Sequence, residues 1–202
     1  MITLRDITRY MRMGGTLPEG ALAERVEALK EQSLAIIRPA RIWRHVTLPL
    51  PVESNSLAHH LEGCHAAYLV CGTIGAEFDA FHRRMAVMSG TDAFIVQAIG
   101  TAAIEAWMDS VEDEICQELE PDEVLISRFS PGYGDLPLDY QRTLVTVLDT
   151  SRRIGVSLTS TLLMVPTKSV SAIIGVRRQG ASRQEDVLQA VNEKRVPPDS
   201  IG

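Results

Sequence analysis

The sequence predicts an α+β fold in which helices flank a twisted, mainly antiparallel sheet. Strand-like and helix-like segments follow one another in mixed order, whereas a doubly wound parallel sheet needs their regular alternation. The apolar run over residues 66–71 (AAYLVC) has the length and composition of a buried strand. Near the C-terminus, two further strand-like runs are separated only by Pro166-Thr167-Lys168, an arrangement typical of a β-hairpin.

Residues 1–90 are expected to hold the N-terminal helices and strands. Gly14-Gly15 ends a first short helix, and Pro18 suits the first turn of a second. Gly63 is suited to end a third helix, because glycine accepts the left-handed conformation found after many helices. The predicted elements are helices over residues 3–12, 18–39 and 56–63, and strands over residues 42–50 and 66–71.

Residues 91–180 are expected to form the ligand-binding segment of a single domain that spans residues 1–202. Ser89-Gly90-Thr91 separates two long helices at its start. A capping box in residues 182–185 (SRQE) predicts a further helix to about Lys194, and the tail over residues 197–202 is expected to be frayed. The predicted elements are helices over residues 75–88, 92–119 and 138–153, and strands over residues 124–128, 160–165 and 170–176.

Composition is ordinary for a globular protein and argues against several partners. Hydrophobic residues make up 45% of the chain, yet no apolar run reaches the ~20 residues of a membrane helix. The N-terminus lacks the apolar core of a signal peptide, so a cytoplasmic location is expected. A net charge of −6 gives no general attraction to nucleic acid. The three cysteines make an odd number, which fits reduced thiols.

Two clusters of titratable residues are given structural interpretations. Residues 109–123 contain many carboxylates and no lysine or arginine, and are interpreted as a solvated helix face and loop in preference to a docking surface. The second cluster would need three or four converging groups to bind zinc, and only His82 lies near it in the sequence. No metal site and no catalytic residue is predicted. The residues of this second cluster are His59, His60, Cys64 and His65.

The segment over residues 128–137 (RFSPGYGDLP) is the main candidate for a functional site. Its prolines and glycines predict a loop of defined shape between a strand and a helix. Arg128 offers a planar fork of donors for a carboxylate or phosphate, and Tyr133 offers a flat face and a hydroxyl. From these residues alone two interpretations stay open. The loop either holds a small ligand or is a turn whose Arg128 makes an ordinary surface ion pair.

The spacing Arg128-x-x-x-Gly132-Tyr133 resembles the S-adenosylmethionine (SAM)-binding signature of the activation domain of cobalamin-dependent methionine synthase. Residues 97–107 (QAIGTAAIEAW) resemble the helix that precedes this signature, and residues 164–171 (MVPTKSVS) resemble the family's later Met-x-Pro and Ser-Val-Ser pattern. The similarity extends over about residues 92–176. The N-terminal pattern, Arg9-Tyr10 followed by Gly14-Gly15 and a long helix, is similar to free-standing versions of the domain.

The resemblance implies an α+β fold and a SAM site built around the loop. Arg128 would bind the carboxylate of SAM, the backbone from Ser130 to Gly134 would hold the adenosyl group, and Tyr133 would line the pocket. Glu105 lies at the position of a family glutamate. It either faces the pocket and pairs with ligand hydroxyls or the ammonium group, or it solvates a helix face. The ligand-binding residues so implied are Arg128, Ser130, Gly132, Tyr133, Gly134 and Glu105.

The resemblance also implies an activity and partners. The chain would be an accessory subunit for reductive reactivation, presenting SAM as methyl donor to cob(II)alamin carried by a partner protein. That partner would be a cobalamin-binding methionine synthase or a related corrinoid protein, with a flavodoxin- or ferredoxin-type reductant. Such a subunit positions a ligand and does little covalent chemistry itself.

Two alternatives stay open. Residues 172–178 contain none of the tyrosines that the family carries there, which favours a non-catalytic docking subunit of a corrinoid methyltransferase that does not use SAM. The pocket would otherwise bind a different nucleotide-like metabolite.

Overall fold

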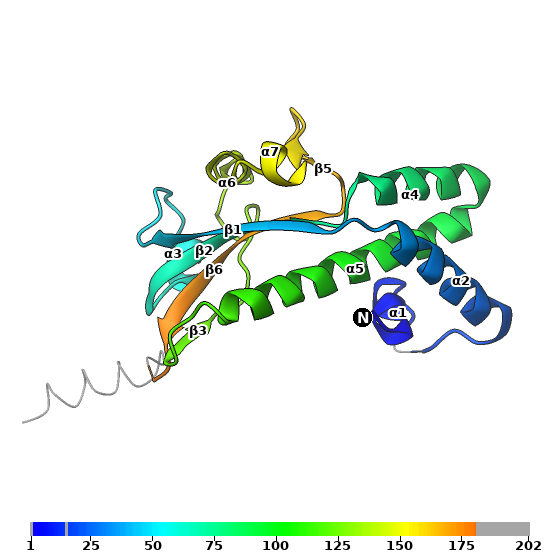
Figure 1. Ribbon diagram of the computed structural model, residues 1–202, viewed down its shortest axis with the longest axis horizontal. Coiled ribbons are helices and arrows are strands. Elements are labelled where there is room, and N and C mark those ends of the chain that lie inside the picture. Colours follow the sequence, from blue (N-terminus) through cyan, green and yellow to red (C-terminus); the bar gives the residue numbers. More distant parts are fainter. Residues whose placement is uncertain (1, 15, 181–202) are drawn as a thin grey trace, which may run out of the picture.

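Four antiparallel strands in the order β1-β2-β6-β3 form the sheet around which the chain is built (Figure 1). The computed structural model describes residues 2–14 and 16–180, so the helix and tail expected beyond residue 181 lie outside the described residues. The strands are β1 (Ala40–Thr47), β2 (Cys64–Thr73), β3 (Glu123–Leu125), β4 (Ser157–Leu158), β5 (Met164–Val165) and β6 (Ser169–Arg178). The helices are α1 (Leu4–Tyr10), α2 (Gly20–Ile36), α3 (Asn55–His60), α4 (Ala76–Met88), α5 (Gly90–Cys116), α6 (Tyr140–Leu148) and α7 (Thr150–Ile154).

Helices cover both faces of this sheet. Figure 1 shows α5 running along one face, with α6 and α7 on the other. The predicted α+β fold with a mainly antiparallel sheet is therefore confirmed. Within residues 2–14 and 16–180, no helix has the length and apolarity needed to cross a membrane.

The two central strands are apolar without interruption because both of their faces are buried. Side chains alternate along a strand, so in β2 Tyr68 and Val70 face the core on the α5 side, whereas Leu69 and Cys71 face the α6 side. In β6, Ile174 and Ile173 are divided between the two cores in the same way. Burial on both sides explains why residues 66–71 show no alternation of polar and apolar residues.

Close packing of α4 against α5 fixes the long helix beside the sheet. Ser89 accepts a hydrogen bond from the backbone N–H of Asp92 and so caps α5, as the sequence predicts. Gly100 lets the two helices approach, since a Cβ atom there would lie 2.4 Å from the ring of Phe78. Glu105 lies near the middle of the α5 helix that is held in this way, and there it meets Arg128.

Three sequence-based expectations about these elements are wrong in part. The strand expected over residues 42–50 ends at Thr47, because Pro49 offers no N–H to a ladder. The helix expected over residues 138–153 is divided into α6 and α7 at Asp149, which adopts a left-handed conformation with φ 52°.

The expected hairpin between residues 160–165 and 170–176 does not form. Strand β5 pairs with β4 in a separate two-stranded sheet, while β6 pairs with β2 and β3. The turn-forming residues between the two segments do not determine how the strands pair, because burial of β6 at the centre of the main sheet decides its partners.

Candidate functional site

The loop over residues 128–137 has the defined shape that its glycines and prolines predict. Gly132 and Gly134 adopt positive φ values of 93° and 55°, which L-residues rarely tolerate. The N–H of Gly132 donates to the Leu136 carbonyl, and the N–H of Leu136 donates to the Tyr133 carbonyl. Leu136 is 1% exposed and anchors the loop in the core beneath α6, whereas Tyr133 is 63% exposed.

Asp135 fastens the far side of this loop to the start of α3. Its carboxylate accepts hydrogen bonds from the hydroxyl of Ser54 and from the backbone N–H groups of Asn55 and Ser56. These bonds, led by that of Ser54, lower the pKa of Asp135 to about 2. Gly134 packs against Ser56 at the same point, since a Cβ atom there would lie 2.3 Å from the Ser56 hydroxyl oxygen.

We expect Asp135→Asn to lower the thermal midpoint of the protein at neutral pH, because an amide cannot accept all three hydrogen bonds. Asp135 has a pKa below its usual 3.8, so its contribution to stability is present above about pH 3.8. That contribution is lost as the pH falls towards 2. Thermal melts of both proteins from pH 7 to pH 2 should therefore converge in acid, and a constant difference would contradict this account.

A β-bulge between β3 and the loop aims Arg128 at α5. The N–H of Ile126 donates to the Gly175 carbonyl, and Phe129 then exchanges both backbone hydrogen bonds with Ile173. Three steps along one strand therefore match two along the other, which leaves one extra residue and reverses the alternation of side chains. As a result, the side chain of Arg128 lies on the side of the sheet that α5 covers.

Arg128 meets three carboxylates of α5. Its Nη2 donates to Glu105 at 3.1 Å and to Asp109 at 2.9 Å, and its Nε lies 2.9 Å from Glu112. Burial and the neighbouring carboxylates raise the pKa of Glu112, with burial the larger cause, against the opposing effect of Arg128. Nη1 of Arg128 is buried and has no hydrogen-bond partner among the described residues. One nitrogen of the guanidinium group thus has no acceptor for its N–H groups.

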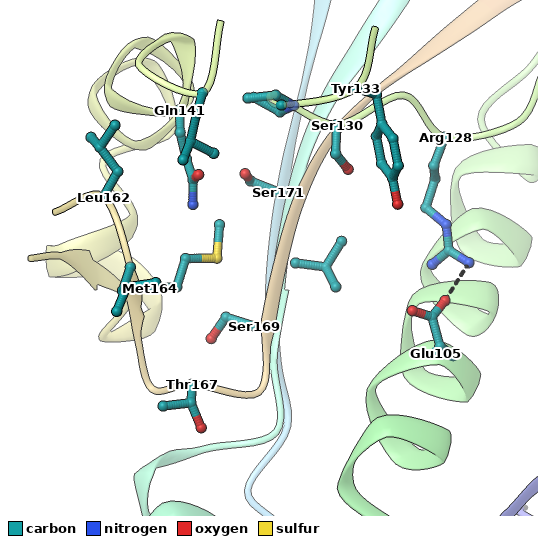
Figure 2. Close-up of a pocket in the computed structure, with 15 residues that line it drawn as sticks. Glu105, Arg128, Ser130, Tyr133, Gln141, Leu162, Met164, Thr167, Ser169 and Ser171 are labelled. Carbon is teal, nitrogen blue, oxygen red and sulfur yellow. Dashed lines mark hydrogen bonds and ion pairs between the residues drawn. The ribbon is translucent and has the colours of Figure 1, made fainter. Parts of the chain in front are cut away.

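These residues border a groove of about 610 Å³ along the edge of β6. Strand β3 pairs only with the last part of β6, so the beginning of β6 is an open edge that the groove follows. Figure 2 shows Arg128 and Glu105 at one end of the groove, and Gln141, Leu162 and Met164 at the other. The groove is lined by Glu105, Arg128, Ser130, Pro131, Gly132, Tyr133, Leu138, Gln141, Leu162, Leu163, Met164, Thr167, Ser169, Val170 and Ser171.

Five of the six residues expected at the site therefore lie around one groove. Gly134 is not among the lining residues, and its role in the loop is the close approach to Ser56. The N–H groups of Gly132 and Tyr133 donate within the loop, and the Tyr133 carbonyl oxygen accepts from Leu136. Among the described residues, the Gly132 carbonyl oxygen and the Ser130 hydroxyl have no partner, so these two groups are available to a ligand.

Sequence reasoning missed the opposite end of the groove. Gln141 and Ser171 are 6% and 4% exposed, and both line the groove. Ser171 belongs to the Ser-Val-Ser pattern noted in the sequence, but Gln141 gave no signal beyond being a polar residue in an amphipathic helix.

The interpretation of residues 109–123 as a solvated helix face is only partly right. Besides Asp109 and Glu112, Glu114 forms an ion pair with Arg41, and Glu118 accepts a hydrogen bond from the indole N–H of Trp43. These carboxylates are therefore paired with cations and hydrogen-bond donors of β1 and the loop. The partners lie far from residues 109–123 in the sequence, so the sequence alone does not reveal the pairs.

The histidines near α3 have partners of their own. Nε2 of His60 lies 2.7 Å from the Ser127 carbonyl oxygen, and His65 pairs with Glu123. Among the described residues, no three His, Cys, Asp or Glu side chains are placed to hold a metal ion. Burial raises the pKa of Cys71 to about 12, so this thiol is not poised to act as a nucleophile.

By its fold and its groove, the chain belongs to the α+β domains that carry a ligand-sized groove at an open sheet edge. Within that class, residues 101–183 match the family described as "Vitamin B12 dependent methionine synthase, activation domain". The resemblance inferred over residues 92–176 is thereby confirmed from residue 101 onward, and all residues that line the groove lie in the matched segment.

A solved structure supports the same fold for the rest of the chain. The crystal structure of the MetH reactivation domain bound to AdoHcy superposes with a TM-score of 0.60 and 13% sequence identity, covering 95% of this chain and 81% of that chain. At that identity the likeness shows a shared fold. No curated protein matches the chain.

Proposed function

We propose that this chain supports the reductive reactivation of a cobalamin-dependent methionine synthase or a related corrinoid protein by presenting SAM as the methyl donor. The observation that carries the proposal is the groove beside Arg128, formed by the segment that matches the activation-domain family. Its volume of about 610 Å³ lies within the ~300–1,000 Å³ typical of small-molecule sites.

The two ends of SAM differ in chemistry, and so do the two ends of the groove. The uncommitted Nη1 of Arg128 is a donor for the methionyl carboxylate, while Glu105 beside it is an acceptor for the ammonium group. The carboxylates around Arg128 outnumber it, which favours a ligand that also carries positive charge, as the ammonium and sulfonium groups of SAM do. Tyr133 and Ser130 of the loop line the groove between these charges and Gln141 (Figure 2).

The chain's contribution to the reaction is positioning. The cobalamin of a partner protein would supply the methyl acceptor, and a flavodoxin- or ferredoxin-type protein would supply one electron. The reduced cobalamin would supply the electron pair of the new bond to the methyl carbon, while the electron pair of the broken sulfonium S–CH₃ bond would stay on sulfur and S-adenosylhomocysteine would leave. Exposed Tyr133 stands at the rim of the groove, where a docked partner would meet the ligand.

One observation favours the alternative of a docking subunit that does not use SAM. Arg128 is already paired with three carboxylates, so the loop has a stable arrangement without a ligand. In this second function the family-like surface would bind a corrinoid protein while the groove stays empty.

We expect Arg128→Lys to weaken SAM binding by about 10- to 100-fold, because a lysine keeps the charge but loses the fork of donors. Calorimetric titration of the wild type and the variant with SAM measures this effect. Arg142→Lys is the matched control, since Arg142 is a half-exposed arginine of α6 that pairs with Asp139 away from the groove lining.

The same titration separates the two functions. A wild-type protein that gives neither heat nor a thermal shift with SAM contradicts the main proposal and favours the docking subunit. If SAM binds, a mixture with a cobalamin-loaded methionine synthase and a reductant should convert SAM to S-adenosylhomocysteine only when this chain is present. Chromatographic quantification of both compounds follows that conversion.

A further inference from the structure

Two polar side chains of low exposure, at the end of the groove remote from Arg128, have no hydrogen-bond partner in the part of the chain that the structure describes. Gln141 of α6 is 6% exposed and Ser171 of β6 is 4% exposed. Among the described residues neither side chain makes a hydrogen bond, and both line the groove. Figure 2 shows the Gln141 amide and the Ser171 hydroxyl pointing into the same end of the groove, away from Arg128 and Glu105.

The polar atoms of both side chains reach the groove, since neither is among the fully enclosed polar atoms that lack a partner. Most polar side chains of such low exposure in folded proteins have a hydrogen-bond partner in the protein or in ordered water, and a ligand can take the place of that water. Methionine or leucine at position 141 would suit the apolar neighbours of Gln141, which include Met164, Leu162 and Leu138 along the groove. An amide in that position is therefore available to a polar ligand and contributes little to the apolar packing.

The open edge of β6 adds backbone groups at the same place. Ile173 exchanges both backbone hydrogen bonds with Phe129, so the N–H and C=O of Ile173 point to the β3 side of the strand. Backbone groups alternate in direction, so those of Ser171 point the same way. In the described chain no strand continues β3 along Ser171, which leaves one N–H donor and one C=O acceptor directed at the groove.

A donor, an acceptor and an amide that supplies both suit the edge of a nucleobase. Adenine presents an amino donor next to ring-nitrogen acceptors, and a glutamine amide pairs with these two groups at once. The side chain of Met164, also drawn in Figure 2, offers a polarizable surface for the flat face of the base. The charged end at Arg128 lacks these features.

We propose that the end of the groove formed by Gln141, Ser171 and Met164 is an adenine subsite, in which the Gln141 amide reads the polar edge of the base. This inference rests on the proposed function and deepens it, because it fixes the direction of the ligand. The amino-acid tail lies at Arg128 and Glu105, and the base lies against the beginning of β6. Gln141 is a specificity-determining residue of the site, and the loop over residues 128–137 holds the other end of the ligand.

The test uses Gln141→Met, which keeps the length of the side chain and removes its hydrogen bonds. Affinities are measured by calorimetry for three ligands: SAM, S-adenosylhomocysteine and 5′-methylthioadenosine, which has the base and sugar but no amino-acid tail. We expect Gln141→Met to weaken all three about tenfold or more. Arg128→Lys should weaken only the two ligands that carry a carboxylate.

A second measurement distinguishes ligand recognition from a structural role. Because the Gln141 side chain has no hydrogen-bond partner within residues 2–14 and 16–180, Gln141→Met should leave the thermal midpoint unchanged or raise it. A lower midpoint would indicate a structural role and would overturn the inference. Ser171→Ala should weaken all three ligands as well, by a smaller factor, since the backbone groups of residue 171 remain.

The outcomes of this experiment are distinct. If wild-type protein binds none of the three ligands, the proposed function fails and the subsite fails with it. If the wild type binds SAM but Gln141→Met binds all three ligands with unchanged affinity, the proposed function stands and the adenine subsite is wrong. If Gln141→Met loses SAM binding but binds 5′-methylthioadenosine as the wild type does, Gln141 contacts the amino-acid tail, and the assigned direction of the ligand is reversed.

Discussion

Replacement of Phe78 with alanine is expected to lower the free energy of unfolding by about 3–5 kcal/mol. Phe78 is 1% exposed, and its ring fills the space that Gly100 leaves open between α4 and α5. Since glycine offers no side chain to fill the gap, the variant would keep a cavity at the centre of this helix pair. Chemical denaturation monitored by circular dichroism measures the loss.

The matched control for this prediction is Val87→Ala in the same helix. Val87 is 89% exposed, so its truncation should change the free energy of unfolding by less than about 0.5 kcal/mol. Comparable losses in the two variants would show that helix propensity, and not the packing of Phe78 on Gly100, governs the stability of α4.

Much of the fold could be predicted because several segments carry their signals locally. Residues 66–71 are apolar on both faces of the sheet, and an apolar run of that length is typical of a buried strand. Ser89 caps α5 with its own side chain, so the break between the two long helices is visible in three consecutive residues. Gly132 likewise marks a turn, since its φ of 93° is closed to most residues.

Other features were decided by residues that meet only in the fold. The bulge at Ser127 and Arg128 depends on which residues of β6 lie opposite these two residues, and no local sequence pattern predicts it. The expected hairpin between residues 160–165 and 170–176 was wrong for a similar reason, because β6 finds its partners in β2 and β3. Strand pairing is a property of the whole sheet and not of the turn between two segments.

The candidate site was predicted at one end and missed at the other. Arg128 and Tyr133 lie in a segment with two prolines and two glycines, which marks it as an ordered loop. Gln141 lies in an amphipathic helix where a polar residue is ordinary, and only its 6% exposure shows that it faces inward. A sequence shows that a side chain is polar but not that it is buried without a partner.

The loop itself provides the second large effect, because one buried side chain attaches it to the core. Leu136→Ala is expected to lower the free energy of unfolding by about 2–5 kcal/mol, since Leu136 is 1% exposed and packs in the core beneath α6. Its N–H and C=O also hold Tyr133 and Gly132 in place. A looser loop would spread the positions of Arg128 and Tyr133, so SAM affinity should fall in the same variant.

Leu138→Ala is the control that separates the loss of stability from the loss of SAM affinity. Leu138 is 45% exposed and lines the groove, so its truncation should cost less than about 1 kcal/mol of stability. Equilibrium denaturation and calorimetric titration with SAM are performed on both variants under conditions where each is folded. A variant Leu136→Ala that binds SAM as tightly as the wild type would show that the loop keeps its shape through its glycines and the clamp at Asp135, without its anchor in the core.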